Sequence, residues 1–270
     1  MAAGNGDTGK GDTGKRRIAC IVQYDGTNYN GWQIQRNGRT IQGVIEESLF
    51  TLTREKVRVV ASGRTDTGVH AIGQVIHFDL ASSIRLEKIC IGLNGILPHD
   101  ISIKNAFHTE STFHSRFSAV EREYRYYIYN YPQRSPFMRY RAMWVHDPLN
   151  VDYIREVASQ LVGVHDFSSF CKKRESYSKN TVRKLNRIEV KNIEHYIEIL
   201  FKGNAFLHNM IRIIIGTILQ MHKTNEDPSL IRHIIERRDR DVSGKTAPPY
   251  GLYLYEVTYD PPLTAMESAF

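Results

Sequence analysis

Segments with the apolar pattern of strands alternate with segments patterned as amphipathic helices, and a second unit broadly repeats the order of the first. The first unit is expected to form strands at 18–24, 57–61, 74–80 and 101–107, with helices at 41–52 (capped by Thr40) and 86–93. The second is expected to form strands at 123–131 and 252–259, a hairpin at 184–191 and 195–201, and helices at 151–162, 205–221 and 229–237. Two such units favour an α+β fold with antiparallel or mixed sheets and helices on one face. Periodicity alone leaves the strand order open.

The composition is that of a globular chain with an excess of positive charge. The formal charge of +7 and a pI of about 9.2 favour a polyanionic partner, most commonly nucleic acid. Cys20, Cys90 and Cys171 lie far apart, which argues against a disulfide framework or a structural zinc and fits a reducing cytoplasm. No secretory signal is visible, and the longest apolar run, 210–221, is too short to span a bilayer, so no membrane role is expected.

One carboxylate stands between two glycines just past an expected strand. Asp66 lies in the segment Ala-Ser-Gly-Arg-Thr-Asp-Thr-Gly-Val-His-Ala, residues 61–71. Arg64 is close enough in sequence to pair with Asp66 and keep it ionised and oriented, as a nucleophile, a base or a stabiliser of positive charge. The alternative is an Asx-turn in which Asp66 only caps its own backbone. Gly68 is expected to turn the chain with a positive φ.

Arg212 interrupts an expected helix, 205–221, that is apolar nearly all round and is therefore expected to be buried. A buried arginine needs a partner. Either its guanidinium reaches water past Ile211 and Ile215, or it pairs with an acidic side chain from elsewhere in the fold.

Basic residues gather in one stretch of the second unit that also contains Tyr177. The RNA-binding candidates there are Lys172, Lys173, Arg174, Lys179 and Arg183, followed by Lys184 and Arg187. A basic loop with an aromatic residue can hold phosphates and stack on an unpaired base, although such a run also occurs as a simple solvated face. Weaker candidates are Arg16, Arg17, Arg36 and Arg39. The histidines at 70, 77, 114 and 208 show no metal-ligand spacing, and His70 is expected to support the Asp66 loop.

Several blocks resemble, in order, the motifs of the TruA family of tRNA pseudouridine synthases. The segment 63–71 is similar to the family's catalytic motif and 24–33, Tyr-Asp-Gly-Thr-Asn-Tyr-Asn-Gly-Trp-Gln, to its N-terminal signature. Further similar blocks lie at 73–78, 93–98, 113–119, 124–126, 166–170, 204–212 and 251–254. The resemblance implies two ferredoxin-like (RRM-like) α/β halves that share a mixed, mainly antiparallel sheet, with helices on one face and the catalytic cleft between the halves. The expected divisions are a tail at 1–15, halves at 16–112 and 113–262, and a C-terminal tail at 263–270.

The resemblance also implies a site and a reaction. Asp66 would be the nucleophile that converts uridine to pseudouridine in the anticodon stem-loop of tRNA, at positions 38 to 40. Arg64 and Arg212 would orient charge, Arg212 by pairing with Asp66, while Tyr124 would support a flipped-out base and Leu252 would pack in the site. The family acts without metal or organic cofactor, usually as a homodimer. This sequence departs from many relatives at Glu123, where they have a basic residue, which is expected to weaken a local phosphate contact.

Three alternatives fit parts of the pattern. An RNA-binding protein without catalysis would share the charge and the aromatic residues, but would not need Asp66 in its glycine-flanked setting. An aspartic protease would use the triplet Asp66-Thr67-Gly68, but such sites need two carboxylates that share a proton, and Arg64 would disturb that sharing. An N-glycosidase would break the same bond and release free uracil.

Overall fold

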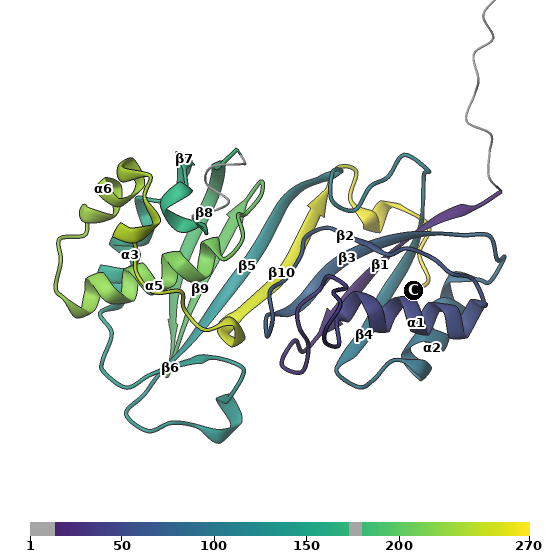
Figure 1. Cartoon of the computed structure of the whole chain (residues 1–270), viewed down its shortest axis with the longest axis horizontal. Coiled ribbons are helices and arrows are strands. Elements are labelled where there is room, and N and C mark those ends of the chain that lie inside the picture. Colours follow the sequence, from purple (N-terminus) through teal and green to yellow (C-terminus); the bar gives the residue numbers. More distant parts are fainter. Residues whose placement is uncertain (1–13, 173–179) are drawn as a thin grey trace, which may run out of the picture.

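The computed structural model describes residues 14–172 and 180–270, and its first half is one ferredoxin-like unit (Figure 1). The elements of this half are β1 (Arg16–Tyr24), α1 (Ile41–Thr53), β2 (Val60–Ala61), β3 (His70–Leu80), α2 (Leu86–Ile96) and β4 (Ile101–Thr109). The sheet order is β4-β1-β3, with β2 also paired to β3. This places the first and third strands at the centre, as in a βαββαβ unit.

The second half repeats this arrangement with additions. Its elements are β5 (Ala119–Asn130), β6 (Met143–Val145), α3 (Val151–Ser159), β7 (Gly163–Asp166), β8 (Val182–Ile193), β9 (Tyr196–Gly203), α5 (Met210–Lys223), α6 (Leu230–Arg237) and β10 (Leu252–Tyr259). The order β10-β5-β9-β8 matches that of the first half, while β7 extends the far edge and β6 pairs with β5. The expected α+β fold of two such halves sharing one sheet is confirmed. In Figure 1, α1, α2 and α5 lie in front of this sheet.

The two halves join along one edge of β3. The first residues of β3 pair in parallel with β10, through His70 with Tyr253 and Ala71 with Leu254. Later residues of the same strand pair with the short β2. The connection from β2 to β3, residues 62–69, therefore lies where the sheet passes from one half to the other, and this connection contains Asp66.

The faces of β5 differ in chemistry. Tyr124, Tyr126 and Ile128 alternate on one face and are buried in the core. Between them, Glu123 lies 2.7 Å from the Arg125 guanidinium and 2.9 Å from the Lys202 ammonium. Glu123 is thus buried within an ion-pair network of the sheet.

Some element boundaries differ from the expected ones. The strand β2 has two residues instead of the expected 57–61, β3 begins at His70 ahead of residue 74, and the short strands β6 and β7 were not expected. The largest difference is α5, which begins at Met210 and not at 205. Asn209 adopts a left-handed φ of 62°, and the ring of Phe206 packs edge-on against Tyr124 with centroids 5.0 Å apart. Packing against the sheet therefore overrides the helical pattern of this segment.

The chain ends against the first half of the sheet. The Ala269 amide donates to the Ala106 carbonyl (2.9 Å) and the His108 amide to the Glu267 carbonyl (3.0 Å), so residues 263–270 pack along β4. The expected divisions at 112 and 262 stay predictions, and most of the expected tail at 1–15 lies outside the described residues. Within 14–172 and 180–270, no helix is long and apolar enough to cross a membrane.

Close backbone contact fixes the segment 24–33 against the Asp66 loop. A Cβ at Gly26 would overlap the Val69 carbonyl oxygen, whereas a Cβ at Gly95, in α2, would meet nothing within 4 Å. We expect Gly26→Ala to lower the free energy of unfolding by about 1–3 kcal/mol through overpacking. Gly95→Ala should raise it by about 0.4–1 kcal/mol, because alanine loses less backbone entropy on folding. Urea titration of both variants measures the difference; unchanged stability of Gly26→Ala would show that the loop can move aside.

Candidate active site

Asp66 begins a tight turn at the end of the β2–β3 connection. The Val69 amide donates to the Asp66 carbonyl (3.1 Å), and Gly68, the third residue of the turn, has a φ of +77°. A positive φ at that position is typical of a type II turn and favours glycine. The expected conformation of Gly68 is confirmed.

The segment 24–33 holds this loop from one side. The Trp32 amide donates to the Thr65 carbonyl (3.0 Å), and the hydroxyls of Tyr24 and Thr65 are 2.8 Å apart. A Cβ at Gly31 would lie 2.8 Å from the same Thr65 carbonyl oxygen. Glycine at this position lets the two backbones approach each other closely. The segment 24–33 therefore has a structural role, because it packs against the Asp66 loop and holds it in place.

Two basic side chains from the second half contact the two oxygens of Asp66. The Arg212 Nη1 lies 3.1 Å from Oδ2, and the His208 Nε2 lies 3.1 Å from Oδ1. Asp66 keeps 21% of its side chain exposed, against 15% for Arg212 and 38% for His208. The expected pair of Asp66 with Arg212 is confirmed, and Arg212 does not extend to water. His208 was not expected here, because its place in the sequence gives no sign that it precedes a helix beginning at Met210.

The guanidinium of Arg212 is itself held in place. Its Nε donates to the Ala247 carbonyl (2.8 Å) and its Nη1 to the Asn209 side-chain oxygen (2.8 Å). Asn209 is the residue with left-handed φ that precedes α5. Because α5 begins only at Met210, the side chain of Asn209 is free to accept a hydrogen bond from Arg212 in addition to the Ala247 carbonyl.

These contacts decide the charge of Asp66. Burial raises the pKa of its carboxyl, but the hydrogen bond and charge of His208, followed by the charge and hydrogen bond of Arg212, outweigh burial. The pKa of Asp66 consequently lies below its ordinary value of 3.8. The site thus presents an ionised, oriented carboxylate that is still partly open to a substrate.

Arg64 does not make the contact expected from its sequence position. Among the described residues it forms no ion pair with Asp66, and its side chain is exposed. The expectation of an Arg64–Asp66 pair is wrong. The side chain of Arg64 points into solvent, and Arg212 and His208 contact the two carboxylate oxygens of Asp66 instead. Arg64 is therefore available to a ligand beside the site.

Tyr124 lies in the middle of β5, and Leu252 begins the neighbouring strand β10. The Tyr124 hydroxyl would be 3.7 Å from a Cβ at Gly63, in the Asp66 loop. Burial, followed by the charges of Tyr24 and Asp66, raises the pKa of the Tyr124 phenol, so it stays neutral. Leu252 is buried opposite Tyr126 at the start of β10. Both residues are thus close to the loop from the side of the second half.

Arg122 is a further residue that the sequence did not single out. It is buried, and its guanidinium donates to the carbonyls of Ser62 (3.2 Å), Arg116 (2.6 Å) and Asn204 (2.7 Å). Burial lowers the pKa of Arg122 below the ordinary value of an arginine. One cation therefore joins the start of the Asp66 loop to the segment before β5 and to the segment before α5. The tyrosine-rich sequence of β5 around Arg122 does not indicate that this arginine joins the three segments.

His70 supports the other end of the loop. Its Nδ1 faces the Gly26 amide and the Asp25 carboxylate, each at 3.1 Å, and its Nε2 lies 2.8 Å from the Tyr140 carbonyl. The hydrogen bond of His70 is the main cause that lowers the pKa of Asp25. The ring also stacks on Tyr253, with centroids 4.6 Å apart. These contacts agree with a supporting role.

The basic candidates are spread over the molecule. Lys172 is exposed, and Arg183 donates from β8 to the Asn180 carbonyl (2.8 Å), whereas Lys173, Arg174 and Lys179 lie outside the described residues. Arg17 pairs with Asp79 (2.7 Å), and Arg16 donates to the Ser82 carbonyl (2.9 Å). Among the described residues, none of these basic side chains pairs with Asp66.

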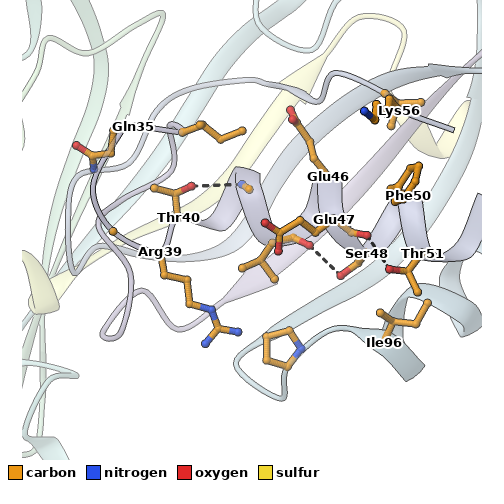
Figure 2. Close-up of a pocket in the computed structure, with 16 residues that line it drawn as sticks. Gln35, Arg39, Thr40, Glu46, Glu47, Ser48, Phe50, Thr51, Lys56 and Ile96 are labelled. Carbon is orange, nitrogen blue, oxygen red and sulfur yellow. Dashed lines mark hydrogen bonds between the residues drawn. The ribbon is translucent and has the colours of Figure 1, made fainter. Parts of the chain in front are cut away.

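A cavity of about 900 Å³ lies away from Asp66, along α1 (Figure 2). Figure 2 shows Gln35, Arg39 and Thr40 at one end and the glutamates Glu46 and Glu47 along the helix. Because the basic Arg39 and Lys56 are matched by Glu46 and Glu47, this cavity has no excess of positive charge to attract a polyanion. In the described ranges, no group of three His, Cys, Asp or Glu residues could hold a metal ion. The expectation of a reaction without cofactor stays a prediction.

Comparison with known proteins finds relatives over most of the chain. The family model described as tRNA pseudouridine synthase matches residues 20–118 and 157–260. Proteins named tRNA pseudouridine synthase A are 43% identical over 246 residues in Bacillus pumilus (strain SAFR-032) and 41% identical over 246 residues in Bacillus subtilis (strain 168), covering 90% of this chain and 99% of each protein. A chain in the archaeal box H/ACA sRNP Nop10-Cbf5 complex is 14% identical, with a TM-score of 0.35 over 86% of this chain and 46% of that one, a likeness too low to carry weight.

The ion pairs predict how Asp66 titrates. Because folding lowers its pKa, the carboxylate stabilises the fold above the unfolded value of 3.8, and this contribution is lost as pH falls through the folded value. We expect Arg212→Gln to raise the pKa of Asp66, since one of the two cations that oppose burial is then gone. Carbon NMR of the side-chain carboxyl between about pH 2 and 7 measures it. Arg64→Gln is the matched control and should leave this pKa unchanged; an equal rise in both variants would contradict the assigned contacts.

Proposed function

This chain belongs to the tRNA pseudouridine synthase family and is an isomerase, and we propose that it acts on uridine in the anticodon stem-loop of tRNA with Asp66 as nucleophile. The observation that carries the role of Asp66 is its pairing with Arg212, 146 residues away in sequence. A residue that only caps a turn would not need an arginine and a histidine from the opposite half of the molecule.

The proposed reaction replaces the bond from C1′ to N1 of uracil by a bond from C1′ to C5, and a proton leaves C5 while N1 gains one. An oxygen of Asp66 attacks C1′ of the ribose as the bond from C1′ to N1 of uracil breaks, through a transition state with positive charge on the sugar. The uracil turns over, and its C5 displaces the carboxylate to form the new bond. The proton on C5 leaves and N1 gains one, so substrate and product have the same atoms and charge.

The geometry favours Oδ1 as the attacking oxygen. Arg212 holds Oδ2 and is fixed by two further acceptors, whereas Oδ1 faces the more exposed His208. A ribose that approaches from the exposed side meets Oδ1 and takes the place of His208. Arg212 keeps the carboxylate ionised and oriented throughout this step.

Access to Asp66 requires that the target uridine leave its stack. Tyr124 is placed to support the extruded base, because its neutral ring lies beside Gly63 and packs on Phe206. Leu252 would pack beside the base from β10, and the exposed Arg64 would contact the RNA backbone. The roles of Tyr124 and Leu252 follow the family resemblance, whereas the RNA contact of Arg64 is proposed from its exposure.

The choice of positions 38 to 40, the homodimer and the cytoplasmic location are finer parts of the proposal. The family resemblance supports the first two. Cys20 and Cys90 are buried free thiols, which fits a reducing compartment. The basic stretch that begins at Lys172 is proposed to bind tRNA, in keeping with the formal charge of +7.

The test is tritium release from tRNA labelled at C5 of uridine, because isomerisation exchanges the hydrogen at that carbon. We expect release by the wild-type chain and a loss of more than about a thousandfold in Asp66→Asn, as is usual when a nucleophile is removed. Binding of the same tRNA should persist in both. Changing the uridines at positions 38 to 40 to cytidine should abolish release, and sedimentation velocity measures the oligomeric state.

Each alternative has its own outcome. Tight binding without release by the wild-type chain would favour an RNA-binding protein without catalysis. Free uracil among the products would indicate an N-glycosidase. Wild-type rates in Asp66→Asn would leave the family assignment in place but remove Asp66 from the chemistry.

A further inference from the structure

A second cavity, of about 430 Å³, lies next to the support of the Asp66 loop. Most of its lining comes from the connection between β5 and β6, which is the long loop beside β6 in Figure 1. Tyr250, two residues before β10, completes it. The side chains that matter for its chemistry are Tyr129, Arg134, Arg139, Tyr140, Trp144 and Tyr250. We call this site the aromatic–arginine pocket. Its volume falls in the range of small-molecule sites.

The lining combines aromatic rings with positive charge. The Arg139 guanidinium lies 4.4 Å from the centroid of the Tyr140 ring, and Tyr140 and Tyr250 meet edge-on with centroids 6.3 Å apart. The Trp144 indole donates to the Tyr131 carbonyl (2.8 Å), which orients a residue that is 43% exposed. No Asp or Glu is among the described residues around the cavity. Sites for single-stranded nucleic acid combine aromatic rings, on which the bases stack, with positive charge that attracts the phosphates. This lining has both.

The pocket adjoins the β3 end of the loop that bears Asp66. The Tyr140 carbonyl contacts His70, which follows that loop, and Pro249, next to Tyr250, would lie 3.0 Å from a Cβ at Gly68. Tyr140 also has a φ of 67°, a conformation that tyrosine rarely adopts. Such strain persists only where the surroundings hold it, often at binding sites.

We propose that the aromatic–arginine pocket binds an unpaired RNA nucleotide next to the target uridine in the same strand. Its base stacks on Trp144 or Tyr140, and its phosphate contacts Arg134 and Arg139. This inference rests on the proposed function and adds a substrate subsite to it. Because Tyr140 contacts His70 directly, the occupied pocket fixes the RNA relative to the loop that carries Asp66. A face of a second copy of this chain is the competing occupant, but the absence of acids around the cavity favours a polyanion.

The chain contains a built-in reporter for this subsite. Of its two tryptophans, Trp32 is 2% exposed in the core, whereas Trp144 lines the pocket. Unmodified tRNA titrated into full-length Asp66→Asn, which binds without turnover, should quench the fluorescence of Trp144 as a base stacks on it. Trp144→Phe in the same background should remove the change in fluorescence while the pocket keeps an aromatic ring.

A charge-matched pair of variants tests the phosphate contact. Arg139→Gln should weaken tRNA binding about tenfold and reduce the slope of log K against log salt by about 0.7–0.9, the value of one lost phosphate contact. The control is Arg232→Gln, an equal loss of charge at an exposed position of α6 outside the pocket. This control should match the parent chain in both quantities.

The outcomes separate this inference from the proposed function. If the wild-type chain forms pseudouridine but Trp144 gives no signal and Arg139→Gln binds like Arg232→Gln, the subsite is refuted and the function stands. If the wild-type chain forms no pseudouridine, the proposed function fails whatever Trp144 reports. Dissociation of a dimer by Arg139→Gln, with an unchanged salt slope, would assign the pocket to contact between copies and overturn the proposal.

Discussion

The parallel pairing of β3 with β10 is the constraint on which the arrangement of this molecule depends. Only His70 and Ala71 of β3 take part, yet this short ladder joins the four strands of the first half and the six of the second into one ten-stranded sheet. The same edge of β3 pairs with β10 at the start of β3 and with β2 further along the strand. The connection between β2 and β3 must therefore lie at the boundary between the two halves. Asp66 is therefore placed at the junction by strand pairing, and residues of the second half can reach it.

Charge is distributed around this junction so that buried groups have partners. Arg212 and His208 oppose the effect of burial on Asp66, and Arg122 binds carbonyls from three separate segments. A buried cation without such acceptors would be costly. The same contacts that stabilise the junction hold the carboxylate ionised with one oxygen facing an exposed side chain. Stability and the proposed chemistry here use the same interactions.

The aromatic–arginine pocket extends this arrangement to the other side of the Asp66 loop. His70 connects the end of the loop to Tyr140, and Pro249 packs against Gly68, so the pocket adjoins the β3 end of the loop. On the proposed function, one strand of RNA would be held at two points, with the reacting uridine at Asp66 and a neighbouring nucleotide in the pocket. Close packing around the glycines at 26 and 31 gives this loop a rigid bed, which suits a site that must hold a base in one orientation.

The sequence by itself determined the class of fold, most of the elements and the turn at Asp66, because strand and helix periods and the glycine at position 68 act over a few residues. It also marked Arg212 as a residue in need of a partner. The contact with His208, the exposure of Arg64, the start of α5 at Met210 and the role of Arg122 were decided only in the tertiary structure. Each depends on which distant segments strand pairing brings together, and a pattern read along the chain does not contain that information.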